Sequence, residues 1–175
     1  VTQLGTDSTI SVDQTGSNNT SVVTQEAGST NNDAEVEQSG TNAQSTITQS
    51  SVAGPGNRGT ITVNQAGDGA ISSVTQAGQN GLRALVNQTG ASTSTITQLD
   101  RNNRAEITQD GDGNTSVISQ QGRGGRVGNA GSGGASGVVQ LGDDNSSTIT
   151  QGPGRRKTAS INQIGNVNTS TIIQT

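Results

Sequence analysis

The sequence predicts an all-β fold, a β-solenoid of about eight two-stranded coils that stack end to end into a cross-β fibril. Its composition excludes a conventional core, because only 25% of the 175 residues are apolar and none is aromatic. Such a composition is typical of disorder, but a disordered chain has no need of a repeat. The pentapeptide STITQ nevertheless occurs at 45–49, 94–98 and 147–151, with related segments between these copies.

Each copy of the repeat ends in a glutamine, usually 11 residues after the previous one, and Gln3 and Gln174 close the first and last copies. The glutamines expected to form an inward structural ladder are Gln14, Gln25, Gln38, Gln49, Gln65, Gln76, Gln88, Gln98, Gln109, Gln120, Gln140, Gln151 and Gln163. Two positions before every one of them stands Val or Ile. The expected apolar ladder is Val12, Val23, Val36, Ile47, Val63, Val74, Val86, Ile96, Ile107, Ile118, Val127, Val138, Ile149 and Ile161.

The spacing within one copy predicts a strand followed by a corner. A small residue, usually Ala or Ser, stands four positions before the glutamine, so the small residue, the Val or Ile and the glutamine share one face of a strand. Glycine two positions after the glutamine and asparagine five positions after it both tolerate positive φ and tight turns. Two such copies make one coil of about 22 residues, which is the pattern of a β-solenoid.

One interval in the repeat, the 20 residues from Gln120 to Gln140, is too long for a single copy. The segment GRVGNAG at 125–131 fits a degenerate copy, with Val127 in the aliphatic place and Asn129 in the glutamine place. Sixteen copies are then expected. They make residues 1–175 a single solenoid domain with loop insertions near 50–60 and 152–157.

Stacking of the coils explains why the same residues recur in each copy. Coils stacked at the strand spacing of roughly 4.8 Å place each side chain above its counterpart. A buried amide is costly unless both of its ends are bonded. In a ladder, the NH₂ of one glutamine meets the C=O of the next, as in cross-β structures. The glutamines are therefore expected to fix the register and to have no catalytic role.

The two outward faces of the solenoid are expected to differ. Odd-numbered copies carry Thr, Ser and Val outward, whereas even-numbered copies carry charges such as Asp13, Glu37 and Arg126. When the degenerate copy is counted, Leu141 and Ile164 fall on the uncharged face and the Thr-x-Thr pair at 148/150 falls on the charged one. The residues proposed as a lateral contact face are Thr46, Thr48, Thr95 and Thr97.

Several function classes find no support in the residues. The chain has no Cys, His or Tyr, so the common nucleophile–base pairs and zinc sites cannot be built, and neither an enzyme nor a cofactor is expected. DGDGN at 110–114 resembles the start of a calcium loop, but Thr115 and Gln121 replace its essential Gly and Glu. A net charge of −4 without aromatic residues argues against nucleic-acid binding. Apolar runs of three or four residues exclude a membrane-inserted segment.

The repeats resemble those of the curlins, the subunits of bacterial curli fibres, whose pattern is S-x5-Q-x-G-x-x-N-x-A-x3-Q. Residues 92–109 match it at Ser92, Gln98, Asn103, Ala105 and Gln109. The resemblance extends over essentially the whole chain. It implies a secreted, extracellular, cell-surface fibre of functional amyloid that supports biofilm matrix and adhesion, with a nucleator subunit and a secretion pore as further partners.

Self-assembly is the mechanism that the pattern favours. The end coils of a solenoid expose unpaired backbone groups, and head-to-tail pairing of such ends gives a filament. The six acids and no bases of residues 1–57, against nine bases and seven acids in the remainder, favour the same polarity. The alternative function is an ice-binding β-solenoid that uses flat Thr-x-Thr arrays, such as those at 46/48 and 95/97.

Overall fold

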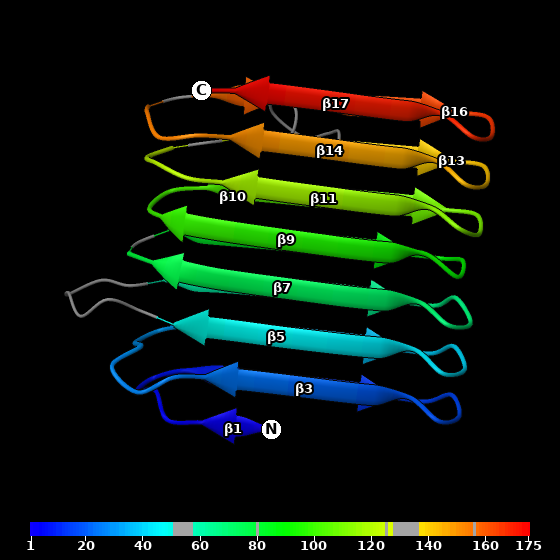
Figure 1. Ribbon diagram of the computed structural model, residues 1–175. Helices are drawn as coiled ribbons and strands as arrows, with labels where there is room; N and C mark the ends of the chain where they lie inside the picture. The colour runs from blue at the N-terminus through cyan, green and yellow to red at the C-terminus, as the bar shows by residue number, and fades with distance from the viewer. Residues whose placement is uncertain (51–57, 80, 125, 128–136, 156) are drawn as a thin grey trace, which may run out of the picture.

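The computed structural model describes residues 1–50, 58–79, 81–124, 126–127, 137–155 and 157–175, and in these it contains strands and no helix (Figure 1). The sheet that contains β1, here the first sheet, comprises β1 (Thr2–Gln3), β3 (Thr20–Gln25), β5 (Gln44–Ser50), β7 (Ile71–Gly78), β9 (Thr93–Asp100), β11 (Thr115–Gln120), β14 (Ser146–Gln151) and β17 (Thr169–Gln174). The second sheet comprises β2 (Thr9–Gln14), β4 (Asp33–Gln38), β6 (Gly59–Gln65), β8 (Leu82–Gln88), β10 (Arg104–Asp110), β12 (Arg126–Val127), β13 (Val138–Leu141), β15 (Thr158–Ala159) and β16 (Ile161–Ile164).

The chain alternates between the two sheets, so each strand pairs in parallel with the strand one coil away. The prediction of an all-β solenoid is therefore confirmed. The register places like residues side by side: Val74 pairs with Ile96, which pairs with Ile118. Figure 1 shows the coils stacked in order along one axis, with the chain termini at opposite ends. Of the two expected insertions, residues 51–57 and Arg156 lie outside the described residues.

The prediction of a separate degenerate copy at 125–131 is wrong. Val127 of β12 pairs with Ala105 of β10, whereas Val138 of β13 pairs with Ile107 of the same strand. β12 and β13 therefore share a single level, the place of one strand in the sheet, because both pair with the same strand β10. In register Val127 aligns with Ala105 and Ala159, and it does not align with the Val/Ile positions as predicted. Asn129 lies outside the described residues, and its expected place in the glutamine ladder is taken by Gln140.

The physical reason for this arrangement is the continuity of the ladders. Val138 and Gln140 align with Ile107 and Gln109 on one side and with Ile161 and Gln163 on the other. A full-length amide thereby stays in line at this level. The first sheet has eight levels and the second has seven, because β12 with β13 and β15 with β16 each fill one. The solenoid thus has about seven turns and not eight.

The core is a narrow double column of branched aliphatic and small side chains. Val23, Ile47, Val74, Ile96, Ile118 and Ile149 of the first sheet are fully buried, and Val36, Val63, Val86, Ile107 and Val138 of the second sheet face them. Next to this column, the second sheet carries Ala34, Ala84 and Ala105, whereas the first sheet carries serines. The hydroxyls of Ser21, Ser45, Ser72 and Ser94 are buried and find no hydrogen-bond partner among the described residues.

Replacing Ser72 with alanine is expected to raise the free energy of unfolding by about 1 kcal/mol, because a buried hydroxyl without a partner opposes folding. Alanine already fills the same column in the second sheet, so the space suits it. Urea unfolding of the freshly prepared monomer measures the effect. Ser147→Ala is the matched control: Ser147 donates to Ser116 (3.1 Å), and removing that bond should stabilise nothing. Equal gains in both variants would contradict the explanation.

The corners use two different properties of their residues. At Gly16, Gly40 and Gly67 an added Cβ would lie 1.6 to 2.4 Å from a carbonyl oxygen of the next coil, so close approach requires glycine there. Two residues after each of these glycines the backbone is left-handed, with Asn18 and Asn42 at φ 56° and 57°. Val167 occupies the corresponding place in the last such corner at φ 60°. A β-branched side chain is disfavoured in that region.

Replacing Val167 with asparagine is expected to stabilise the chain by about 1 kcal/mol, since asparagine tolerates the left-handed conformation that costs other L-residues roughly this much. The side chain of Val167 is 74% exposed, so little apolar burial is lost. Thermal unfolding of the two chains measures the gain. Val167→Thr keeps the β-branch and should leave the midpoint unchanged; a similar rise with threonine would locate the effect elsewhere.

Candidate functional site

The glutamines of the first sheet form a hydrogen-bonded ladder along the axis. The Nε2 of Gln25 donates to the Oε1 of Gln49 (2.9 Å), and the Nε2 of Gln76 donates to the Oε1 of Gln98 (2.9 Å). The remaining steps are Gln49 to Gln76 (3.2 Å), Gln98 to Gln120 (2.9 Å), Gln120 to Gln151 (3.0 Å) and Gln151 to Gln174 (2.9 Å). Every amide donates toward the C-terminal end, so the ladder has one direction.

The second sheet carries the same kind of ladder with the same direction. Its steps run from Gln14 to Gln38 (2.5 Å), Gln65 (2.8 Å), Gln88 (3.0 Å), Gln109 (3.0 Å), Gln140 (2.8 Å) and Gln163 (2.8 Å). Every glutamine from Gln25 to Gln163 in the two ladders is almost fully buried, whereas Gln14 on the first level is exposed. These bonds tie each coil to the next one through side chains as well as through the backbone.

Most of these amides also bond the opposite sheet, a contact that the repeat pattern does not predict. The Nε2 of Gln98 donates to the backbone oxygen of Arg83 (3.0 Å), and that of Gln109 donates to the oxygen of Thr93 (3.1 Å). One amide group thus satisfies an acceptor along the axis and another across the core. A buried amide that meets its partners in this way holds register, because a slip of one residue would break both bonds.

The corner asparagines form a further ladder. The backbone N–H of Asn145 donates to the Oδ1 of Asn114 (3.0 Å), while the Nδ2 of Asn114 donates to the oxygen of Gly142 (2.7 Å). Asn168 bonds Asn145 in the same way (3.0 Å). The only signal for this ladder in the sequence was the recurrence of asparagine five positions after the glutamine, which was interpreted as a turn preference.

The outward side of the first sheet is free of charge along its strands. One column runs Val22, Thr46, Ser73, Thr95, Val117, Thr148, Thr171, and the next runs Thr24, Thr48, Thr75, Thr97, Ser119, Thr150, Ile173. The repeat pattern predicts Thr148 and Thr150 on the other face, and Leu141 and Ile164 on this one. Both assignments were wrong, because they counted the degenerate copy as a separate level.

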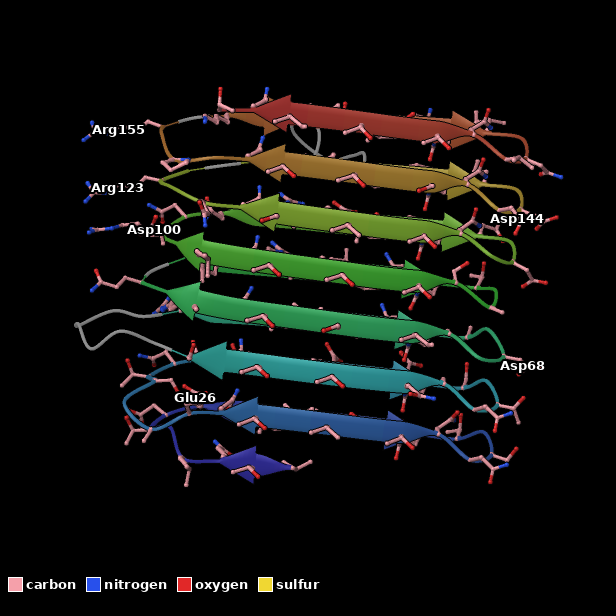
Figure 2. The ribbon with its side chains drawn as sticks, viewed as in Figure 1. Glu26, Asp68, Asp100, Arg123, Asp144 and Arg155 are labelled. Atoms are coloured by element: carbon pink, nitrogen blue, oxygen red, sulfur yellow. The ribbon has the colours of Figure 1, made fainter. Side chains whose placement is uncertain are left out.

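The second sheet and the corners carry the charges (Figure 2). Asp13 pairs in register with Glu37 near the N-terminal end, and Arg83 pairs with Arg104 further along. At one line of corners Arg101, Arg123 and Arg155 follow one another in parallel register. Figure 2 shows Arg123 and Arg155 extending outward from adjacent coils on the same side of the solenoid, opposite Asp68 and Asp144.

The acidic corner residues bond the backbone of their neighbours. Asp112 Oδ1 accepts from the backbone N–H of Ala91 (2.9 Å), and Asp143 Oδ1 accepts from that of Asp112 (3.0 Å). The side-chain and backbone hydrogen bonds from Thr41 lower the pKa of Asp68. Among the described residues no cluster of three or more potential metal ligands occurs. No helix in the described part of the chain could span a membrane.

These ladders and the fold define a class, the structural β-solenoid repeat proteins whose coils are joined by stacked amides. Residues 5–40 and 101–128 match the family model of the curlin associated repeat, which supports the assignment of the chain to the curlin family. No curated protein and no solved structure matches the chain. The repeat match and the fold together indicate a structural protein.

Proposed function

We propose that the chain is a structural subunit of an extracellular, curli-like amyloid fibre that assembles head to tail and supports biofilm matrix and adhesion. The direction of the ladders is the observation that carries this proposal. All strand pairs are parallel and every ladder amide donates toward the C-terminal end. The edge formed by β16 and β17 therefore complements the N-terminal edge of a second copy, and it does not complement the β16–β17 edge of that copy. Such head-to-tail contact favours an open filament.

The distribution of charge supports the same polarity. Asp13, Asp33 and Glu37 lie on the first two levels of the second sheet, whereas the strands of its last two levels carry no acidic residue in their described parts. End-to-end contact thus brings a neutral edge against an acidic one, and avoids the repulsion that two acidic ends would meet. Salt screens exposed charges over about 10 Å at 0.1 M, so this effect concerns the rate of encounter more than the stability of the fibre.

Electron microscopy and fibre diffraction of the purified 175-residue chain at neutral pH test the proposal. Unbranched fibres with a meridional spacing of about 4.8 Å are expected. Material that stays monomeric at high concentration, or fibres without this spacing, would rule the proposal out. Antibody labelling of intact producing cells tests the location, since a secreted cell-surface fibre is accessible without permeabilisation. The dependence of fibre growth in those cells on a nucleator subunit and on a secretion pore tests these two partners.

The uncharged face of the first sheet is proposed as the surface through which filaments bundle. Thr46 and Thr48 lie on β5, and Thr95 lies on β9, which is separated from β5 by β7. Replacing these three with lysine should separate bundles into single filaments while elongation continues. Thr62, Asn87 and Thr108 replaced with lysine add the same charge to the second sheet and provide the control. Bundles that persist in the Thr46, Thr48 and Thr95 variant would show that this face does not join the filaments.

An ice-binding solenoid is the second candidate, and the position of Thr148 and Thr150 is what favours it. They extend the Thr-bearing columns over seven successive levels of one sheet, beyond the pairs at 46/48 and 95/97. Such a protein acts as a monomer. Thermal hysteresis of the freshly prepared monomer would support ice binding, whereas rapid fibre growth without hysteresis would eliminate it.

A further inference from the structure

We propose that filaments of this chain join side by side through their corners, with a line of arginines on one filament against a line of aspartates on the next. This inference rests on the proposed fibre and adds a second contact between filaments, on a different side of the solenoid from the uncharged face. The partner is a second copy of this chain. The contact lies on the interior coils, between β6 and β15.

Charge is divided between the two lines of corners. The segments that lead from the first sheet to the second, together with the first two residues of the strands that follow, hold every basic residue of the described chain: Arg58, Arg83, Arg101, Arg104, Arg123, Arg126, Arg155 and Lys157. The segments that lead back, each counted from the last residue of a second-sheet strand, hold no base and five acids: Asp68, Asp110, Asp112, Asp143 and Asp144.

These five acids form the acidic corner line, and the basic corner line comprises Arg83, Arg101, Arg104, Arg123 and Arg155. The two lines lie at opposite edges of the solenoid. Figure 2 shows this for Arg123 and Arg155, which extend on the side opposite Asp68 and Asp144. A neighbouring filament placed edge to edge therefore brings unlike charges together.

The basic corner line is a stack of like charges with few partners in the fold. Arg101 and Arg155 both pair in parallel register with Arg123, so these positions repeat at the strand spacing of roughly 4.8 Å. Like charges on neighbouring strands repel one another. Within the described residues one ion pair occurs, between Arg104 and Glu106 (3.7 Å), and the other four arginines of the line have none. A partner that carries carboxylates at the same spacing lowers this repulsion.

The acidic corner line holds its carboxylates in place and leaves them exposed. The Oδ1 of Asp112 accepts from the backbone N–H of Ala91, and the Oδ1 of Asp143 accepts from that of Asp112, so one oxygen of each is tied to the adjacent coil. The Oδ2 of each accepts no hydrogen bond from the described residues. Hydrogen bonds from a guanidinium to a carboxylate are among the stronger ones, and these oxygens are the acceptors offered to a neighbouring filament.

β10 sets the two lines at the same height along the axis. It begins at Arg104, at one edge, and ends at Asp110, at the other. On the next level Arg126 begins β12, and Asp143 comes two residues after the end of β13. Two filaments that point in the same direction, without an axial shift, therefore bring the bases of one against the acids of the other on adjacent levels. The match recurs in every copy along the fibre.

The acids on the basic side do not oppose this contact. The Oδ2 of Asp100 accepts from a backbone N–H of the next coil (3.0 Å), and Asp100 forms no ion pair with a described residue. Glu26 and Asp33 occupy the same line of corners on earlier coils. The corner segments of a neighbour that face them at that height, 15–19 and 39–43, carry no charge. Edge-to-edge contact thus meets no like charge there.

The contact gains strength from repetition. One exposed ion pair contributes little, because water and salt weaken it. Along two fibres the pairs are linked, so each contact raises the effective concentration for the next. Filaments are therefore expected to pair, whereas single solenoids stay apart. Salt weakens the contact, since the screening length falls from about 10 Å at 0.1 M to about 3 Å at 1 M.

Zero-length cross-linking tests the contact directly. The only lysine of the chain, Lys157, bonds backbone oxygens, so an amine placed in the basic corner line is a specific probe. Fibres of the Arg123→Lys chain, treated with a carbodiimide that joins amines to carboxylates, should yield amide links to the acidic corner line. Such a link joins two filaments, because the two lines lie on opposite edges of each solenoid. Thr97→Lys places the same amine on the uncharged face and should yield none. No link from the first variant, or equal yields from both, would overturn the proposal.

Exchange of charge gives an independent test. In the acidic variant both edges become acidic, because glutamate replaces Arg101, Arg123 and Arg155. In the neutral variant only the basic line stays charged, because asparagine, which keeps the Oδ1 acceptors, replaces Asp110, Asp112, Asp143 and Asp144. Neither variant should pair with itself at about 0.1 M salt, and a mixture of the two should pair. Cryo-electron tomography counts the filaments that lie side by side in a layer. Self-pairing in either variant, or a mixture that stays single, would contradict the edge contact.

Salt separates this contact from the uncharged face. Raising it from about 0.1 M to about 1 M should part the filaments within a layer and leave layers stacked through the uncharged face. Lysine at Thr46, Thr48 and Thr95 removes the stacking, so single filaments of that variant are expected at about 1 M and layers one filament thick at about 0.1 M. Layers that stay wide at 1 M would rule the edge contact out while leaving head-to-tail assembly intact. Failure of the unmodified chain to form fibres would overturn both.

Discussion

Replacing Gly67 with alanine is expected to lower the free energy of unfolding by about 3 kcal/mol, the upper part of the range for overpacking a tightly packed site. The added Cβ would lie 2.4 Å from the oxygen of Gly90 and 2.5 Å from its carbonyl carbon. These are backbone atoms of the adjacent coil, so no side-chain rotation relieves the contact. Two coils must separate locally, which weakens the amide ladders on either side. Urea unfolding of freshly prepared monomer measures the loss.

Gly69 provides the matched control because it lies in the same corner and differs in the reason for which glycine is present. Its φ is 72°, and the atom nearest to an added Cβ is the Cβ of Ala91 at 3.9 Å. Gly69→Ala should therefore lose only about 1 kcal/mol, the cost of the left-handed conformation for alanine. Equal losses in the two variants would mean that backbone conformation, and not coil-to-coil distance, explains Gly67.

These two glycines show what the sequence can and cannot predict about the corners. The spacing of glycine after each glutamine predicted a corner correctly, and the general tolerance of glycine for positive φ supplied a reason. At Gly67 that reason does not hold, since glycine is needed there by the oxygen of Gly90 in the next coil. Distances between coils depend on which copies stack, and a single copy of the repeat does not contain that information.

The error at Val127 has a related cause. GRVGNAG contains a branched residue and an amide at the right spacing, and so does the segment Val138–Gln140. The local sequence pattern does not distinguish a separate degenerate copy from a single copy that is divided between β12 and β13. The choice depends on pairing with β10 and β16 above and below, where only Val138 and Gln140 continue both ladders. All positions after this point keep their inward or outward orientation, but they change sheet, which is why Thr148 and Leu141 were assigned to the wrong faces.

The glutamine at the end of each copy could be placed from sequence alone, because period-two spacing fixes the side of the strand and the repeat fixes the stacking neighbour. Its second partner could not be placed. The bond from Gln98 to the oxygen of Arg83 depends on the distance between the two sheets, which follows from the volumes of side chains such as Ile96 and Val86 packed between them.

Replacing Gln98 with leucine is expected to lower the free energy of unfolding by about 4 kcal/mol, since each buried polar group that loses its partner costs roughly 1–3 kcal/mol. The substitution keeps most of the side-chain volume and removes three bonds. The Nε2 of Gln76 loses its acceptor at 2.9 Å, the Oε1 of Gln120 loses its donor at 2.9 Å, and the oxygen of Arg83 loses the cross-core bond. Denaturant unfolding of the monomer measures the loss.

The sign of this effect separates two explanations for the stability of the solenoid. If apolar packing alone joined the coils, leucine would extend the column of Ile96 and stabilise the chain. If the amide ladders join them, leucine leaves unpaired groups on both neighbouring levels, and the loss exceeds any gain in apolar burial. Gln121→Leu controls for the change of residue type, because Gln121 is exposed and its backbone N–H still bonds Gln151 (2.8 Å). That variant should stay within about 0.5 kcal/mol of the unmodified chain. A stabilised Gln98→Leu variant would contradict the role given to the ladders, both within the chain and between its copies.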